Sequence, residues 1–145
     1  MKILFFAGSS ARNQALIEQA KTKYQDVIAV RWNHWDGQED REDDYKRVIQ
    51  ALKAHPDARV IAKSYGGALV MRALSNHKIR NTDITILGAL PTALKQEDID
   101  TKNVSQRVQV IQNEYDPHGS YQEVKKYLSN VHCIKGNDTH TYKLP

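Results

Sequence analysis

Ser64 lies in the segment of the chain with the clearest chemical pattern. A hydrophobic run leads into AKSYGG, residues 62–67, and apolar residues with helical spacing follow. Small residues two positions before and after a serine let a strand turn sharply into a helix, so that the serine side chain projects above a sheet. At such a turn the next backbone N–H, that of Tyr65, lies at a helix N-terminus, where negative charge is stabilised. The pattern indicates a serine nucleophile, with a plain helix N-cap as the alternative.

A serine nucleophile needs a base to accept its proton and an acid to hold that base in the right tautomer. Asp116 comes shortly after the hydrophobic run 108–112, and His140 comes shortly after the last such run, 131–135. On a parallel α/β sheet that carries such a triad, the order along the chain is serine, acid, histidine. Both residues therefore lie where the geometry requires an acid and a base.

Six short apolar runs alternate with longer amphipathic segments along the chain. Nearly continuous apolar runs are typical of strands covered on both faces, and the spaces between them are long enough for crossover helices. The expected fold is therefore α/β, a three-layer sandwich with a mainly parallel sheet. The expected strands are 3–7, 27–32, 59–62, 84–88, 108–112 and 131–135; the expected helices are 13–24, 41–54, one directly after the serine turn, and 120–128; the polar segment 92–106 is expected as a loop with a short helix.

At these residues the chain resembles the α/β-hydrolase fold superfamily, most closely its small, lidless members related to the dienelactone hydrolases. In those proteins the acid lies in a Gly-x-x-Asp-Pro-x-Gly type turn and the histidine in a Gly-x-Asp-His-x-Phe/Tyr type loop. Here the segments NEYDPHG and GNDTHTY correspond to them, with Thr139 as an extra residue and Ala62 where glycine is usual. By this resemblance Ser64 is the nucleophile, His140 the general base and acid, and Asp116 the residue that orients His140.

The same resemblance implies the sheet order 2-1-3-4-5-6, with a topological switch point between the first and third strands. The loops after these two strands then flank one crevice. In that crevice the backbone N–H groups of Ser9 and Tyr65 would hold the oxyanion of an acyl-transfer reaction. For the first loop, a strand-to-helix turn with Ser10 as the helix cap is the alternative.

Two other carboxylates compete with Asp116 for the role of the acid. Glu114 is two residues away, and Asp138 lies next to the histidine loop. Asp116 is favoured because its Asp-Pro turn matches the family, whereas Glu114 is typical of an exposed loop carboxylate. Asp138 follows an asparagine and is typical of a turn-forming residue.

The loop 32–37 contains both tryptophans, Trp32 and Trp35, next to the expected crevice. Aromatic side chains often line pockets for acyl or aryl groups, so we expect these residues to bind substrate. Covering the end of the core is the alternative for a tryptophan at a strand end. The acidic run 39–44 follows, and with His34 and Asp36 it has the composition of a metal site. Because it precedes an amphipathic helix, capping and solvation are the favoured interpretation, and no metal is expected.

Length and composition limit the class of protein further. The 145 residues suit one domain, residues 1–145, and 21 Lys and Arg against 17 Asp and Glu give a formal charge of +4 with the two signs mixed along the chain. No basic block indicates nucleic-acid binding. No apolar run has the length of a signal-peptide core or a membrane span, and the single cysteine, Cys133, allows no internal disulfide. We expect a cytoplasmic monomer or homodimer without membrane insertion.

The resemblance implies a serine hydrolase that cleaves a small ester, thioester or related acyl substrate and needs no cofactor. The alternative is a non-catalytic α/β protein that binds a nucleotide, a flavin or a protein partner in the same crevice. Neither a Gly-x-Gly-x-x-Gly fingerprint nor a Gly-x-x-x-x-Gly-Lys-Ser/Thr loop is present to favour the nucleotide alternative.

Overall fold

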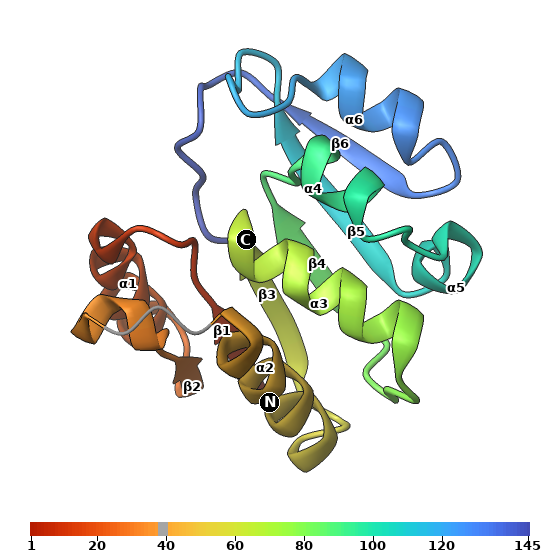
Figure 1. Ribbon diagram of the computed structural model, residues 1–145. Coiled ribbons are helices and arrows are strands. Elements are labelled where there is room, and N and C mark those ends of the chain that lie inside the picture. Colours follow the sequence, from red (N-terminus) through yellow and green to blue (C-terminus); the bar gives the residue numbers. More distant parts are fainter. Residues whose placement is uncertain (38–40) are drawn as a thin grey trace.

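A computed structural model describes residues 1–37 and 41–145 of the chain. In that part of the chain, six strands form one sheet in the order β2-β1-β3-β4-β5-β6, and every neighbouring pair is parallel (Figure 1). The strands are β1 (Lys2–Phe6), β2 (Asp26–Val30), β3 (Arg59–Lys63), β4 (Ile84–Leu87), β5 (Val108–Asn113) and β6 (His132–Gly136). The expected α/β class and strand order are confirmed.

The helices lie in the crossover connections between the strands. They are α1 (Gln14–Lys23), α2 (Arg41–Ala54), α3 (Tyr65–Asn76), α4 (Pro91–Gln96), α5 (Thr101–Ser105) and α6 (Tyr121–Tyr127), with short 3₁₀ helices η1 (Ala11–Asn13) and η2 (Asn33–Asp36). The segment expected as a loop with one short helix forms both α4 and α5. Pro91 begins α4, and the side chain of Asp100 caps α5 by accepting the N–H of Asn103.

Side chains along β1 alternate between the two faces of the sheet, as the pleat of a strand requires. Leu4 and Phe6 belong to the large core cluster that includes residues of α2 through α6, whereas Ile3 and Phe5 belong to a smaller cluster with α1. One face of the sheet is therefore covered by five helices, and the other by α1 and residues near the C-terminus, in the part of the chain that the structure describes. None of the helices described is long and apolar enough to cross a membrane.

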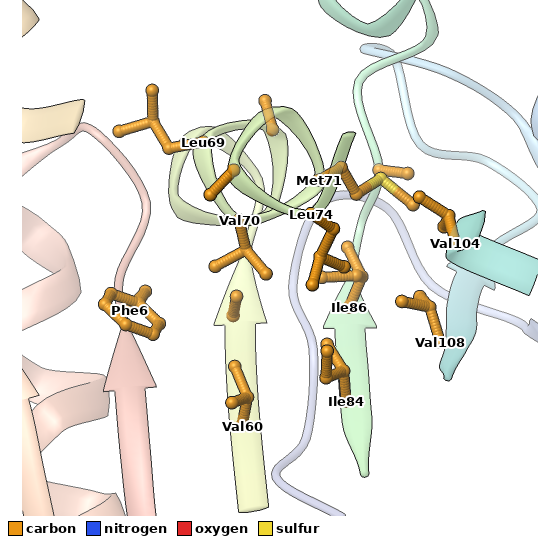
Figure 2. Packing of buried hydrophobic residues seen from close by; sticks show 14 of the residues in the cluster. Phe6, Val60, Leu69, Val70, Met71, Leu74, Ile84, Ile86, Val104 and Val108 are labelled. Carbon is orange, nitrogen blue, oxygen red and sulfur yellow. The ribbon is translucent and has the colours of Figure 1, made fainter. Parts of the chain in front are cut away.

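Helix α3 packs across the centre of the sheet. Its residues Val70 and Leu74 are fully buried and lie above Val60 of β3 and Ile86 of β4, with Phe6 of β1 alongside (Figure 2). Burying a side chain of this size stabilises the fold by about 1.5–3 kcal/mol relative to leaving it exposed. This packing fixes the helix that begins immediately after Ser64.

The turn from β3 into α3 holds Ser64 in a backbone conformation that L-amino acids rarely adopt, with φ 53° and ψ −113°. Gly66 makes the turn possible by lying directly on the end of β1. A β carbon at Gly66 would lie 2.6 Å from the carbonyl oxygen of Ala7 and 2.7 Å from that of Phe6. The Gly66 N–H donates to the Ala7 carbonyl at 3.2 Å. The close contact with β1 therefore holds the strained serine in place.

The strain at Ser64 predicts that Ser64→Gly is more stable than Ser64→Ala. Both variants lose the hydroxyl, but only glycine removes the β carbon that makes the positive φ unfavourable. Strain of about 1–3 kcal/mol is relieved, and about 0.5–1 kcal/mol is offset by the greater entropy of glycine in the unfolded chain. Urea unfolding of the two variants should differ by about 1 kcal/mol in the free energy of unfolding. An alanine variant as stable as the glycine variant would show that the turn is not strained.

Candidate active site

Ser64, His140 and Asp116 form one hydrogen-bonded chain at the carboxyl ends of three strands of the sheet. Ser64 follows β3, Asp116 follows β5 and His140 follows β6. The Ser64 Oγ lies 2.9 Å from His140 Nε2, and His140 Nδ1 lies 2.6 Å from Asp116 Oδ2. Because a carboxylate only accepts hydrogen bonds, Nδ1 carries the imidazole proton and Nε2 is free to accept from the serine hydroxyl. The three side chains are thus arranged for proton transfer from serine to histidine.

Asp116 is buried, with 4% of its surface exposed, and accepts hydrogen bonds from three sources. The imidazole binds Oδ2, the Tyr142 hydroxyl donates to the same oxygen at 2.7 Å, and the His118 N–H donates to Oδ1 at 2.9 Å. Burial, together with the hydrogen bond to Asp116, raises the pKa of the Tyr142 phenol well above its usual value. Tyr142 therefore stays a proton donor to the carboxylate throughout the physiological range.

The loop that carries His140 is held by two residues that sequence reasoning did not single out. The Asn113 side-chain amide donates to the carbonyls of Thr139 and Thr141 at 2.7 and 2.8 Å, and the Asn113 N–H donates to the Tyr142 hydroxyl at 3.0 Å. These bonds bracket His140 on both sides. The extra residue Thr139 is thus accommodated by a hydrogen bond from β5. Tyr142 could have been found as the aromatic residue two positions after the histidine, but Asn113 had no such signal.

Gly88 lets the histidine loop approach the end of β4. Its φ is +69°, and a β carbon there would lie 2.7 Å from the Tyr142 ring and 3.2 Å from Cε1 of His140. Any other residue would therefore be strained at this position and would push both rings away from Asp116.

The two rival carboxylates have other partners. Glu114 lies 3.4 Å from the Lys135 ammonium group, and Asp138 Oδ1 accepts the N–H of Thr139 at 2.8 Å. The contact of Asp138 matches the turn-forming aspartate expected from the sequence, whereas Glu114 is half-buried rather than exposed. Asp116 is the carboxylate that contacts His140.

A cavity of about 330 Å³ opens beside the serine and the histidine. Ser9, Lys63 and His118 are among the residues that line it, together with Ser64 and His140. A second hollow of about 550 Å³ continues from it and shares Lys63, His118 and His140. Burial lowers the pKa of the Lys63 ammonium group, an effect that Asp116 partly reverses. Among the described residues, neither wall contains an aspartate or a glutamate.

The structure does not place the tryptophans in the walls of these cavities. Trp32 is fully buried and belongs to the core: β2 ends before it, at Val30, and its ring packs edge-to-face on Tyr65 of α3. Its indole N–H donates to the carbonyls of Ala7 and Gly8 at 3.2 and 3.1 Å. Trp35 is partly buried, and its indole donates to the Ser9 carbonyl at 2.8 Å. Both side chains hold the loop after β1 rather than line the crevice, contrary to the expectation that they bind substrate.

The acidic run continues into the first turn of α2, as expected for carboxylates at a helix N-terminus, but one of its residues differs from expectation. Glu39 and Asp40 lie outside the described residues. Asp44, expected as a solvated carboxylate, is fully buried and accepts the Tyr65 hydroxyl at 2.7 Å. Within the described residues, no group of three or more His, Cys, Asp or Glu side chains is arranged to hold a metal ion.

The two segments expected to hold the oxyanion flank the serine. Ser9 and Tyr65 both line the cavity of about 330 Å³. Tyr65 begins α3, so its N–H has no partner within the helix. Ser9 lies in the loop between β1 and η1, whose N-cap is Ser10; the Ser10 side chain accepts the Arg12 N–H. The capping role of Ser10 and a role for the Ser9 backbone are therefore compatible.

Comparison with known proteins gives likeness in structure only. No family model matches the chain, and no curated protein matches its sequence. A structure described as a YdeN-like hydrolase from Pectobacterium atrosepticum superposes with a TM-score of 0.73 at 14% identity, covering 96% of this chain and 78% of that one. The ydeN gene product of Bacillus subtilis gives 0.66 at 12% identity, covering 95% and 86%.

A carboxylesterase from Bacillus cereus is similar to the same extent, with a TM-score of 0.65 at 15% identity, covering 99% of this chain and 82% of that one. These likenesses extend over almost the whole chain, and the parallel sheet has the strand order 2-1-3-4-5-6. The protein therefore has the α/β-hydrolase fold.

Proposed function

We propose that the protein is a serine hydrolase that cleaves a small ester, thioester or related acyl substrate through an acyl-enzyme. The observation that carries this proposal is the unbroken hydrogen-bonded chain from Ser64 through His140 to Asp116 at the wall of a cavity. Hydrolases and esterases among the structural neighbours support the same reaction class.

In the proposed reaction, Ser64 Oγ attacks the substrate carbonyl while its proton passes to His140 Nε2. Asp116 keeps the imidazole in the productive tautomer and stabilises the imidazolium that forms. His140 then protonates the leaving group, and the carbon–leaving-group bond breaks to give the acyl-enzyme. Water, deprotonated by His140, attacks the acyl carbon and releases the acid and free Ser64. None of these steps requires a metal ion or a cofactor.

The negative charge that develops on the carbonyl oxygen needs donors placed in advance. In the proposal, the Tyr65 N–H and the Ser9 N–H supply them, since both residues line the cavity beside Ser64. Losing one such donor typically lowers the rate by about 10²–10³-fold. The N-terminus of α3 adds a partial positive charge on the same side.

The proposal predicts that a fluorophosphonate probe labels the folded protein at Ser64. The phosphonyl group forms a bond to Ser64 Oγ as fluoride leaves, because His140 removes the hydroxyl proton. Ser64→Ala should abolish both labelling and the hydrolysis of short p-nitrophenyl esters. Ser105→Ala, a serine of α5 away from the cavity, is the matched control and should keep both. Labelling that persists in Ser64→Ala, or its absence from folded wild-type protein, would refute the assignment.

A second prediction concerns the acid. Asp116→Asn should lower kcat by about 10⁴-fold with little effect on folding, because the amide favours the wrong imidazole tautomer. Glu114→Gln serves as the control, since Glu114 pairs with Lys135, and should retain turnover. Steady-state kinetics with a p-nitrophenyl ester measures both. Equal losses in the two variants would contradict the assignment of the acid.

The cationic character of the cavity predicts a charge preference. Lys63 and Arg12 line the connected cavities, and no described carboxylate does. Acetylthiocholine should therefore be hydrolysed about three- to tenfold more slowly than its uncharged isostere 3,3-dimethylbutyl thioacetate. Lys63→Met should reduce the difference in rate between the two thioesters. Lys126→Met, the same change on the exposed face of α6, should leave that difference unchanged. A faster reaction with the cationic ester would contradict this prediction.

A further inference from the structure

The buried indole of Trp32 contacts the backbone of the segment that follows β1. Its Nε1–H is shared between two backbone carbonyls, that of Ala7 at 3.2 Å and that of Gly8 at 3.1 Å. Trp32 has no exposed surface, so water does not compete for these carbonyls from the indole side. The ring is fixed in turn by edge-to-face packing with Tyr65, at a centroid distance of 5.4 Å.

The Gly8 carbonyl and the Ser9 N–H belong to the same peptide unit. None of the described peptide bonds is cis, and in a trans unit the carbonyl and the N–H point in opposite directions. Because the Gly8 oxygen faces the buried indole, the Ser9 N–H points away from Trp32. Among the hydrogen bonds of the described residues, none is donated by this N–H. It is therefore available to a ligand of the cavity that Ser9 lines.

The next peptide unit is fixed independently. The Ser9 carbonyl accepts hydrogen bonds from Trp35 Nε1 at 2.8 Å and from His34 Nε2 at 2.5 Å. Since a carbonyl only accepts, His34 Nε2 carries a proton. A flip of the Gly8–Ser9 unit would break the bond from Trp32, and a flip of the Ser9–Ser10 unit would break the bonds from Trp35 and His34.

Asp44 ties this loop to the second expected donor. Its carboxylate is fully buried, accepts the Tyr65 hydroxyl at 2.7 Å and faces Nδ1 of His34 at 3.3 Å. Burial and the hydrogen bond to Asp44 raise the pKa of Tyr65 to about 12, so the phenol remains a donor at neutral pH. The Ser9 and Tyr65 segments are therefore held by one connected group of side chains, namely Trp32, His34, Asp44 and Tyr65.

We infer that Trp32 is a positioning residue for the oxyanion hole: its indole N–H, by holding the Gly8 carbonyl, keeps the Ser9 N–H directed into the cavity beside Ser64. The inference rests on the proposed function, because it gives the Ser9 N–H its role in the reaction. Trp32 does not touch the substrate in this account. Its effect is confined to the stage at which negative charge develops on the substrate oxygen.

The test removes the indole N–H while keeping an aromatic ring. Trp32→Phe should lower kcat for a p-nitrophenyl ester by about 10- to 100-fold, with KM changed by less than about threefold, because the lost interaction acts in the transition state. A second readout is inhibition by an alkyl trifluoromethyl ketone. Ser64 Oγ bonds to the ketone carbon, the serine proton goes to His140, and the carbonyl oxygen becomes an oxyanion. Its affinity should fall by the same factor as kcat/KM.

A matched control separates this effect from simple loss of stability. Asn81 is fully buried near the amino end of β4 and donates to the carbonyls of His55 and Ala58 at 2.9 and 3.0 Å. Asn81→Ala should lower the free energy of unfolding but leave kcat and ketone affinity unchanged. If Trp32→Phe does not fold, 3-benzothienylalanine at position 32 preserves the ring shape without the N–H and should give the same losses.

The outcomes distinguish the role of Trp32 from the serine hydrolase proposal on which it rests. A folded Trp32 variant with wild-type kcat and wild-type ketone affinity would overturn the role of Trp32 and leave the serine hydrolase proposal standing. A loss of kcat without a matching loss of ketone affinity would also overturn it. Wild-type protein that neither hydrolyses esters nor binds the ketone would refute the proposed function, and with it this inference.

Discussion

The arrangement of the site depends on the carbonyl group of Ala7, the residue directly after strand β1. It accepts the Gly66 N–H from the turn into α3 and the Trp32 indole from the loop after β2, each at 3.2 Å. The first bond fixes the position of the turn that carries Ser64 relative to the end of β1. The second fixes the start of the loop that contains Ser9. Hydrogen bonds to one backbone oxygen thus help to fix the position of the proposed nucleophile relative to a proposed oxyanion donor.

The parallel sheet brings distant parts of the chain to the same edge. Because the carboxyl ends of β1, β3, β5 and β6 all lie on one side, the loops that follow them meet there. Meeting at an edge does not by itself give the geometry that the proposed reaction needs, since a misplacement of 1 Å can lower a rate about 100-fold. Asn113 and Tyr142 fix the position of the histidine loop more closely. Asn113 donates to two carbonyls of that loop, and Tyr142, which belongs to the loop, donates to Asp116.

Much of the fold and the chain of three side chains could be predicted from the sequence. The length and spacing of the apolar runs identify the strands, and the small residues around Ser64 identify a sharp turn. Both the strands and the turn can therefore be recognised from local sequence. Trp32 could not be assigned in this way. The direction of the Trp32 side chain depends on where β2 ends. The strand ends at Val30 rather than two residues later, and an apolar pattern specifies strand ends poorly.

The burial of Asp44 follows from its position in the helical period of α2. In a run of consecutive carboxylates, charge alone suggests that all of them face water. Asp44, however, precedes the buried residues Val48 and Leu52 at intervals of four, which places it on the inner face of α2. Helical period, rather than charge, identifies the carboxylate that is buried and bonded to Tyr65.

The central claim is that Ser64 becomes acylated during turnover. It is tested most directly by mixing the protein with a short p-nitrophenyl ester, quenching in acid within the first turnover, and locating the added mass on proteolytic peptides. The account predicts a mass increase equal to the acyl group minus one hydrogen, confined to the peptide with Ser64 and assigned to that residue by fragmentation. Rapid release of p-nitrophenol with no acyl group on Ser64, or with the acyl group on another residue, would contradict it.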